Sequence, residues 1–589
     1  MKKTTGSTNQ QAATREQREK AINSSFPSPS NVLSQTMERR GFLFRAASVG
    51  IMAVTAPSLL AACEQLETES LSPTPTGTSF PSATPFNSNA VTATPKATPT
   101  VAPKATPTVA PTVAPTAAPT ATPTAAPTAA PTAAPTATPT ATPVLPSRAP
   151  LSTEGARVSH LLRRAGFGAS KTELAQFRKM GLQGTIDYLV DFDDIDDGEL
   201  EARLAAQTFD STSKGNCQKW WLQRMAYSKR PLQEKMTLFW HGILTSSFSK
   251  ANNKPAMFEQ NELFRREGMG RYDKMLKSVS RDPAMLIYLD SQSNRKKAPN
   301  ENYSRELMEL FTLGIGQYTE EDVQEAARSF TGWQLRKEKE FYFNKNQHDF
   351  GIKTFLGQQG SLDGDDVVDI IMQQPVASEY IVRRLWEFFA YAEPEQTVIA
   401  RLAKVFRTGK TNIRPVVRAI FESEEFYSAR AAQGLIKGPA EFTASAIRTL
   451  GITTVFAGVH RTPVERMGQD LFNPPDVAGW DGGIAWINSS TLMERVNLAN
   501  TLVTDRKGNY KFDPQDLLSD TTANSEAVVD SLVDLLLGDE VSEATRSVLL
   551  EHAKDMGTSP APSGQLVLED EQLRSLVYLI LASPDYQLA

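Results

Sequence analysis

One stretch of sequence decides the fold: SRDPAMLIYLDSQSNRKKAPNENYSRELMELFTLG, residues 280–314. Asp282 followed by Pro283 is typical of a helix N-cap and a first-turn proline, which predicts a helix over residues 283–290. A loop with three cations follows. A second helix is expected over residues 301–313, because its apolar residues recur three and four positions apart. The stretch therefore predicts two helices joined by a basic loop.

Helical patterns extend outward from this stretch in both directions. Thr319, three residues before Asp322, is typical of a capping box at the start of the next apolar run. Apolar residues also recur at helical spacing around Trp221 and Leu385. Strand-like alternation is scarce, with one short hairpin expected around residues 341–343. We therefore predict a mainly α fold, one large multi-helix domain with little β structure, and leave two lobes open as an alternative.

The N-terminal part of the chain carries an export signal. Two adjacent arginines precede Gly-Phe-Leu, which resembles a twin-arginine motif. An Ala-rich stretch of about 17 residues follows and ends Leu-Ala-Ala-Cys, which resembles a lipoprotein box. A membrane span usually needs about 20 mostly apolar residues, so a cleaved signal is favoured over an uncleaved anchor. The signal residues are Arg39, Arg40, Phe42 and Leu43, with the lipid expected on Cys63.

Composition divides the chain into four parts. Residues 1–36 form a polar leader that is expected to be disordered, and residues 37–63 form the signal. Residues 64–150 repeat Pro, Thr and Ala, which excludes helix and sheet and predicts a flexible stalk. At about 3.1 Å per residue, roughly 80 such residues would reach about 250 Å when fully extended. Residues 151–589 are the helical body, which we expect to be extracytoplasmic and lipid-anchored to the membrane.

The charge of the body argues against one class of partner. Residues 1–150 hold 11 Lys and Arg against 6 Asp and Glu, so the rest hold 51 against 61, a charge of −10. General nucleic-acid binding needs basic surfaces, so no nucleic-acid partner is expected. The body has one cysteine, Cys217, and must be stable without a disulfide.

Polar residues crowd one face of the expected helix over residues 301–313. One interpretation is a solvated face with ion pairs between residues four apart. The other is a partly buried cluster that splits acid and base roles or holds a divalent cation. Asp290 favours the second, because a carboxylate at a helix C-terminus opposes the macrodipole. The residues on this face are Glu301, Asn302, Arg305, Glu306 and Glu309.

Two histidines are further candidates. His241 lies in an apolar run, where a lone histidine is usually a hydrogen-bonded core residue and otherwise a ligand or general base. His348 and Asp349 follow the expected hairpin and are the candidate metal ligands, although a two-residue motif is weak. The cofactor stays unknown, with a divalent metal ion as one option. The candidate catalytic set is His241, Asp290, Glu301, Arg305 and Glu306.

The segment NPPDVAGWDGG, residues 473–483, predicts an irregular loop among the helices. Trp480 and Asp481 near its end could line a pocket. Asn302 is the third candidate pocket residue. The alternative is a structural loop that Trp480 pins in place. The sequence lacks a phosphate-binding P-loop, a dinucleotide fingerprint, a haem attachment site, a nucleophile elbow and a His-Glu-x-x-His helix. These absences lower the weight of the common nucleotide, haem and zinc-protease functions.

Several ordered motifs resemble a bacterial family named domain of unknown function 1800. They run from about residue 157 to residue 587 and include the opening stretch, Thr331-Gly332-Trp333, His348-Asp349 and Asp476-Val477-Ala478-Gly479-Trp480. The resemblance implies an exported, largely helical protein without an agreed activity. It also implies a partner of the domain of unknown function 1501 family, which looks related to sulfatases and alkaline phosphatases. The family often has a second histidine where this chain has Ile243.

Three functions remain open at this point. The first is a hydrolase or transferase outside the membrane, with or without metal assistance, in which the candidate catalytic residues and His348 converge on one cleft. The second is a non-catalytic module that binds an envelope polymer or a partner protein. The third is a structural body in which Arg305 and its carboxylates form a buried ionic lock.

Overall fold

The computed structural model describes most of the body and none of the N-terminal parts. The described residues are 150–337, 340–454, 461–505, 510–518, 524–538, 541–555, 559–560, 566–567 and 569–589. All of them belong to one compact unit. The leader, the signal and nearly all of the stalk lie outside the described residues. The predictions for Arg39, Arg40, Phe42, Leu43 and Cys63 therefore stay predictions.

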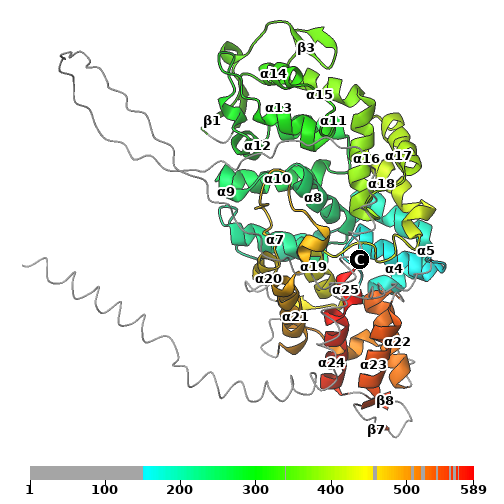
Figure 1. Ribbon diagram of the computed structural model, residues 1–589. Coiled ribbons are helices and arrows are strands. Elements are labelled where there is room, and N and C mark those ends of the chain that lie inside the picture. Colours follow the sequence, from blue (N-terminus) through cyan, green and yellow to red (C-terminus); the bar gives the residue numbers. More distant parts are fainter. Residues whose placement is uncertain are drawn as a thin grey trace, which may run out of the picture. The chain divides into compact units, whose positions relative to one another are not determined.

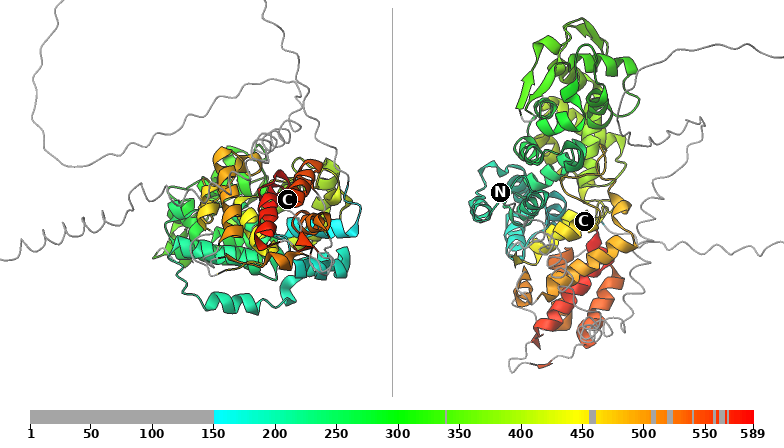
Figure 2. Two further views of the ribbon diagram at one scale, coloured as in Figure 1. Left: turned by 90° about the horizontal axis from the view of Figure 1, so that it is seen from below. Right: turned by 90° about the vertical axis from the view of Figure 1, so that its left-hand side faces the viewer.

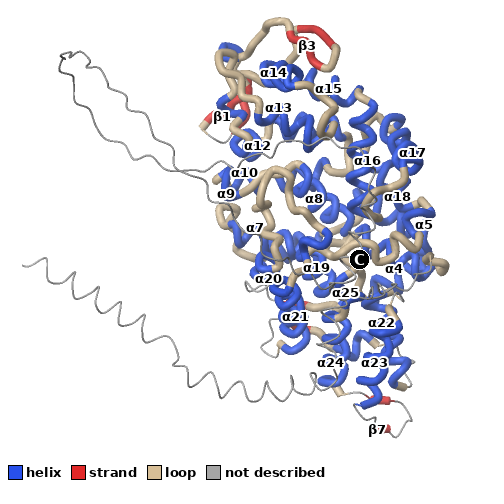
Figure 3. Tube along the Cα trace, viewed as in Figure 1, coloured by secondary structure: helices blue, strands red, loops and turns tan. Residues whose placement is uncertain are grey.

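Helices dominate the described chain, which confirms the predicted mainly α class (Figures 1 and 3). The helices before the loop at residue 291 are α4 (Glu154–Ala165), α5 (Lys171–Val190), α6 (Gly198–Ala205), α7 (Lys214–Tyr227), α8 (Pro231–Ile243), α9 (Phe248–Ala251), α10 (Lys254–Glu267), α11 (Tyr272–Ser280) and α12 (Pro283–Tyr288). Those of the middle are α13 (Asn302–Glu306), α14 (Glu320–Ser329), α15 (Gly364–Gln373), α16 (Pro375–Phe389), α17 (Gln396–Thr408), α18 (Ile413–Phe421), α19 (Pro439–Thr449), α20 (Arg461–Arg466) and α21 (Ser489–Thr504). The last are α22 (Ser525–Leu537), α23 (Glu543–Asp555), α24 (Asp570–Ala582) and α25 (Pro584–Gln587).

The strands form small antiparallel pairs at the edge of the helical body. The predicted hairpin is confirmed, with Trp333 opposite Phe343 and Arg336 opposite Glu340. Strand β1 of this hairpin lies next to α12, and β3 of the pair that follows packs against α14. Both pairs belong to the green end of the described body (Figure 2). The strands are β1 (Trp333–Arg336), β2 (Glu340–Phe343), β3 (Lys353–Phe355), β4 (Gln358–Gly360), β5 (Thr453–Thr454), β6 (Tyr510–Lys511), β7 (Ser559–Pro560) and β8 (Leu566–Val567).

Local capping explains where the predicted helices begin. Asp282 Oδ1 accepts a hydrogen bond from the Met285 N–H at 3.0 Å, which starts α12 at Pro283. The Thr319 side chain accepts from the Asp322 N–H at 3.1 Å, completing the predicted capping box of α14. Helix α12 ends at Tyr288 instead of Asp290, because Asp290 has a left-handed backbone with φ of 58°.

The second helix of the opening stretch is not the continuous α-helix that was predicted. α13 ends at Glu306 and continues as a π-helix, Leu307–Thr312. Three hydroxyls stabilise this irregular turn by donating to its carbonyls. The Thr312 hydroxyl bonds the Leu307 oxygen at 2.5 Å, Tyr380 bonds the Leu310 oxygen at 2.7 Å, and Tyr272 bonds the Phe311 oxygen at 2.5 Å. Helix-end carbonyls need such partners when they are buried, and two of the three, Tyr272 and Tyr380, lie on distant helices that the local pattern does not reveal.

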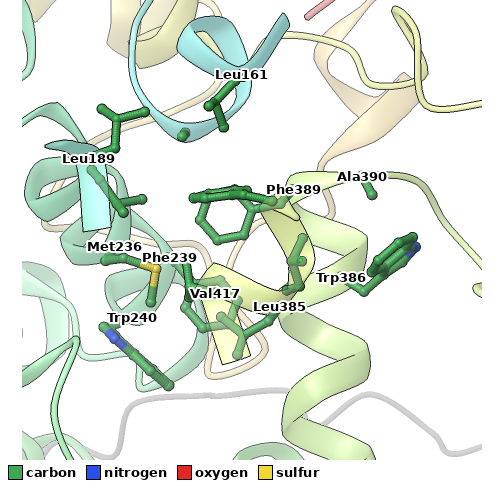
Figure 4. Packing of buried hydrophobic residues seen from close by; sticks show 14 of the residues in the cluster. Leu161, Leu189, Met236, Phe239, Trp240, Leu385, Trp386, Phe389, Ala390 and Val417 are labelled. Atoms are coloured by element: carbon green, nitrogen blue, oxygen red, sulfur yellow. The ribbon is translucent and has the colours of Figure 1, made fainter. Parts of the chain in front are cut away.

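The main apolar core lies between the first helices and α16 to α18. Figure 4 shows Leu161 of α4 and Leu189 of α5 near Met236 and Phe239 of α8, with Phe389 of α16 between them. A second cluster surrounds Trp221 of α7 and includes Cys217, which is fully buried. Among the described residues, no helix combines the length and apolarity that a membrane crossing requires.

Candidate functional site

The polar face of α13 is an ion-paired surface. The Arg305 guanidinium donates to both carboxylate oxygens of Glu320 on α14, each at 2.8 Å. It also contacts Glu301 at 3.3 Å, which confirms the predicted pair between residues four apart. The predicted pair with Glu309 is not formed. Both Glu301 and Glu320 side chains are substantially exposed. The arrangement is therefore a set of solvent-exposed ion pairs and not the buried ionic lock that was considered.

Glu306 is half-buried, as Glu301 and Glu309 are, but unlike Glu301 it takes no part in the ion pairs of Arg305. Burial raises its pKa, and the charge of Glu309 adds to that effect, while Arg305 and Lys250 oppose it. Glu309 instead accepts a hydrogen bond from the Tyr318 hydroxyl at 2.7 Å. Two carboxylates of different environment therefore lie on one short segment, which is an arrangement that can separate acid and base roles.

Two residues that sequence reasoning missed complete this surface. Lys250 of α9 lies 3.6 Å from Asp290 and 5.2 Å from the centre of the Tyr288 ring. Tyr288 is buried, and burial raises its pKa to about 12, with smaller effects from Asp476 and Glu306. No periodic pattern connects Lys250 to Asp290, which lies 40 positions later. We name as the Glu306 surface Lys250, Asp290, Glu306, Glu309, Tyr318 and Asp476, together with the buried Tyr288 whose ring Lys250 covers.

Asp282 is a second carboxyl with an altered environment, and the sequence identified it only as a cap. It is buried and accepts from the Gln260 amide at 2.7 Å and from the Met285 N–H at 3.0 Å. Burial outweighs these hydrogen bonds and raises the pKa of Asp282 to about 7. The Asp282 side chain links α10 with α12 and does not reach the surface.

His241 is a core residue in this fold. Its Nε2 accepts a hydrogen bond from the Phe472 N–H at 3.1 Å. The rings of Trp221 and Trp480 pack against it with centroid distances of 5.4 and 5.5 Å. Burial lowers the pKa of His241 to about 3, so the imidazole is neutral at ordinary pH. These contacts favour the structural interpretation over a role as ligand or base.

His348 and Asp349 form a separate structural corner. His348 Nδ1 donates to the Thr331 carbonyl at 2.8 Å, and its ring packs between Phe343 and Phe350. The Asp349 carboxylate is held by Arg328 at 2.8 Å, which lowers its pKa. Both predicted metal ligands are thus engaged within the fold. Within the described ranges, no group of three or more His, Cys, Asp and Glu is placed to hold a metal ion.

The 473–483 loop is pinned against the end of α8. A Cβ built on Gly479 would lie 2.3 Å from the Gly242 oxygen, so only glycine permits this approach. Trp480 is half-buried against the His241 ring, while Asp481 and Asn302 are exposed. The pocket candidates therefore do not line one hollow. A small cavity elsewhere is lined by Ser159, Lys437, Ser445, Thr449 and Tyr586, and it includes none of the predicted site residues.

Fold and site together give a mainly helical protein with an acidic surface around Glu306. The chain belongs to the family described as Protein of unknown function (DUF1800), whose family model matches residues 160–588. This match confirms the resemblance that the motifs carried. No curated protein and no solved structure matches the chain.

Proposed function

We propose that the protein is an exported lipoprotein, held by a lipid on Cys63 outside the membrane, whose Glu306 surface binds a ligand without transforming it. The ligand class is a basic one, such as a protein surface rich in Lys and Arg. The Glu306 surface carries this proposal because four carboxylates, on α13, the π-helix and two loops, lie there with one lysine, while the neighbouring Arg305 is engaged by Glu320. A partner of the domain of unknown function 1501 family is the first candidate to test.

The positions of the other candidates support binding over metal-assisted hydrolysis. His241 is enclosed by aromatic rings, and His348 and Asp349 are engaged at the hairpin. These contacts therefore do not bring the candidate catalytic residues and His348 together in one cleft, as the hydrolase hypothesis requires. Tyrosine is, by contrast, enriched in protein interfaces, and a carboxylate-rich surface can select a partner of complementary charge.

The test measures binding of the purified full chain to the candidate partner by calorimetry. Glu306→Gln combined with Glu309→Gln should weaken binding at least tenfold, an effect of about 1.4 kcal/mol or more. Glu543→Gln, a similarly conservative change at an exposed site on α23, is the matched control and should leave affinity unchanged. Equal affinity of all three proteins would overturn the proposal, provided urea unfolding shows that each is folded.

A second function is favoured by the half-buried position of Glu306 beside Glu309, which raises the pKa of the Glu306 carboxyl. Such a group can donate a proton in a hydrolase or transferase reaction. Turnover of a panel of chromogenic esters, phosphates and glycosides would identify this activity. Glu306→Gln should abolish it, while Glu301→Gln should retain it. Metal analysis of the same samples would decide the open question of a divalent cofactor.

A further inference from the structure

Three large apolar side chains lie exposed around the β1–β2 hairpin. Phe350 and Ile352 are 59 % and 62 % exposed, and Phe343 is 37 % exposed. The His348 ring joins the two phenylalanines, with centroid distances of 5.1 Å to Phe343 and 4.6 Å to Phe350. Phe343 and Phe350 therefore lie together, and Ile352 follows Phe350 by two residues, whereas scattered exposed apolar residues need no explanation.

Four exposed cations border these side chains. The loop after α12 supplies Arg295, Lys296 and Lys297, and the turn after β2 supplies Lys345. The Lys296 N–H donates to the Gln347 carbonyl at 2.8 Å, which fixes the basic loop directly beside the residue that precedes His348. The hairpin patch is defined as Phe343, Phe350, Ile352, Arg295, Lys296, Lys297 and Lys345.

The nearby carboxylates do not cancel this charge. Asp349 is paired with Arg328 at 2.8 Å, and Glu340 lies opposite Arg336 in the hairpin register. The patch thus keeps its positive charge on a body whose sequence from residue 151 onward is acidic overall. A contrast of this kind selects a negatively charged partner surface.

We propose that the hairpin patch docks on the surface of an anionic lipid bilayer. Exposed Phe and Ile side chains can enter the boundary between headgroups and acyl chains, while Lys and Arg attract anionic headgroups. A soluble anionic polymer would use the cations but leave more than half of Phe350 and Ile352 in water. The bilayer satisfies both features of the patch. This inference does not involve the Glu306 surface.

Docking on the bilayer would also determine where the body of a tethered protein resides. A tether to the same membrane would make contact between the body and the bilayer intramolecular, so even a weak contact would change where the body resides. Each Lys or Arg near an anionic bilayer strengthens binding about fivefold. Four cations with three apolar anchors are therefore sufficient for measurable, salt-sensitive binding.

The experiment uses the full chain with Cys63→Ser, so that no lipid is attached. Flotation is measured with phosphatidylcholine vesicles, with and without phosphatidylglycerol, at low and high salt. Binding is expected only with phosphatidylglycerol and is expected to fall with salt. Phe350→Ser with Ile352→Ser, and separately Lys296→Glu with Lys297→Glu, should each reduce it about tenfold or more.

The matched control substitutions are placed on helices outside the hairpin patch. Met493→Ser removes an apolar side chain of equal exposure, 58 %, from α21, and Lys179→Glu with Lys404→Glu reverses two exposed charges on α5 and α17. Equal loss in these controls, or equal binding to neutral vesicles, would overturn the proposal. So would a change of oligomeric state on patch substitution, which would make a second copy the occupant. Binding of a soluble anionic polymer without vesicle binding would also overturn it.

Discussion

Arg305 makes its bidentate ion pair with Glu320 on the next helix and not with Glu309 on its own helical segment. The cause is the π-helix that begins after Glu306, because its wider turn changes the direction in which Glu309 points. Glu309 then meets Tyr318 instead. The change joins α13 to α14 and leaves Glu306 without a pairing arginine on its own helix face.

The Arg305–Glu320 pair should affect local order more than global stability. Arg305→Lys keeps the charge but loses the planar fork that bonds both oxygens of Glu320. Amide hydrogen exchange in residues 302–312 should become faster, while the unfolding midpoint should change little, because exposed pairs contribute little to stability. A large drop in midpoint would contradict the solvated arrangement described for this pair.

The hydroxyls that cover the π-helix carbonyls should contribute measurably to folding. Tyr272→Phe leaves the buried Phe311 carbonyl without its 2.5 Å partner, which should cost about 1–2 kcal/mol in urea unfolding. Tyr188→Phe is the control, since its hydroxyl bonds the Lys229 carbonyl near solvent at 3.1 Å. Similar small losses in both variants would show that the π-helix does not depend on Tyr272.

Asp282 should make stability fall as the pH rises. Its folded pKa is raised to about 7, above that of the unfolded chain, so its contribution is complete below about pH 4 and is lost as the pH rises through 7. The slope is at most about 1.4 kcal/mol per pH unit. Asp282→Asn keeps a good N-cap and removes this titration. Unfolding of both proteins across pH 4 to 8 measures it, and parallel profiles would refute the prediction.

His241 should have the opposite effect to Asp282, so that stability falls as the pH decreases. Its folded pKa is lowered to about 3, so its contribution is present above the unfolded pKa of about 6.5 and is lost as the pH falls toward 3. His241→Leu should cost about 1–3 kcal/mol at neutral pH, because the Phe472 N–H loses its acceptor. His241→Gln restores an acceptor and should cost less. If bound metal were lost in the leucine variant while stability was unchanged, the structural interpretation would be wrong.

Local signals in the sequence were sufficient for the helix starts and insufficient for the site. The caps at Asp282 and Thr319 act within three residues, so their effect could be predicted. The π-helix depends on Tyr272 and Tyr380, which come from α11 and α16. The hydrogen bond of His241 comes from Phe472, 231 positions later. Long-range partners of this kind decide which polar residues are structural and which stay exposed to a ligand.

The close contact between Gly479 and the Gly242 carbonyl has a consequence for how this protein family can diversify. The loop is located by a backbone contact that leaves no room for a Cβ, and by the Trp480 ring that packs on His241. Three of its outward side chains, Pro475, Ala478 and Asp481, are exposed and take no part in that attachment, whereas the Asp476 carboxylate accepts a hydrogen bond from the Ala478 N–H at 2.9 Å within the loop. Substitutions at these three positions can therefore accumulate without loosening the loop, which makes it a place where relatives can acquire new ligand preferences at little cost in stability.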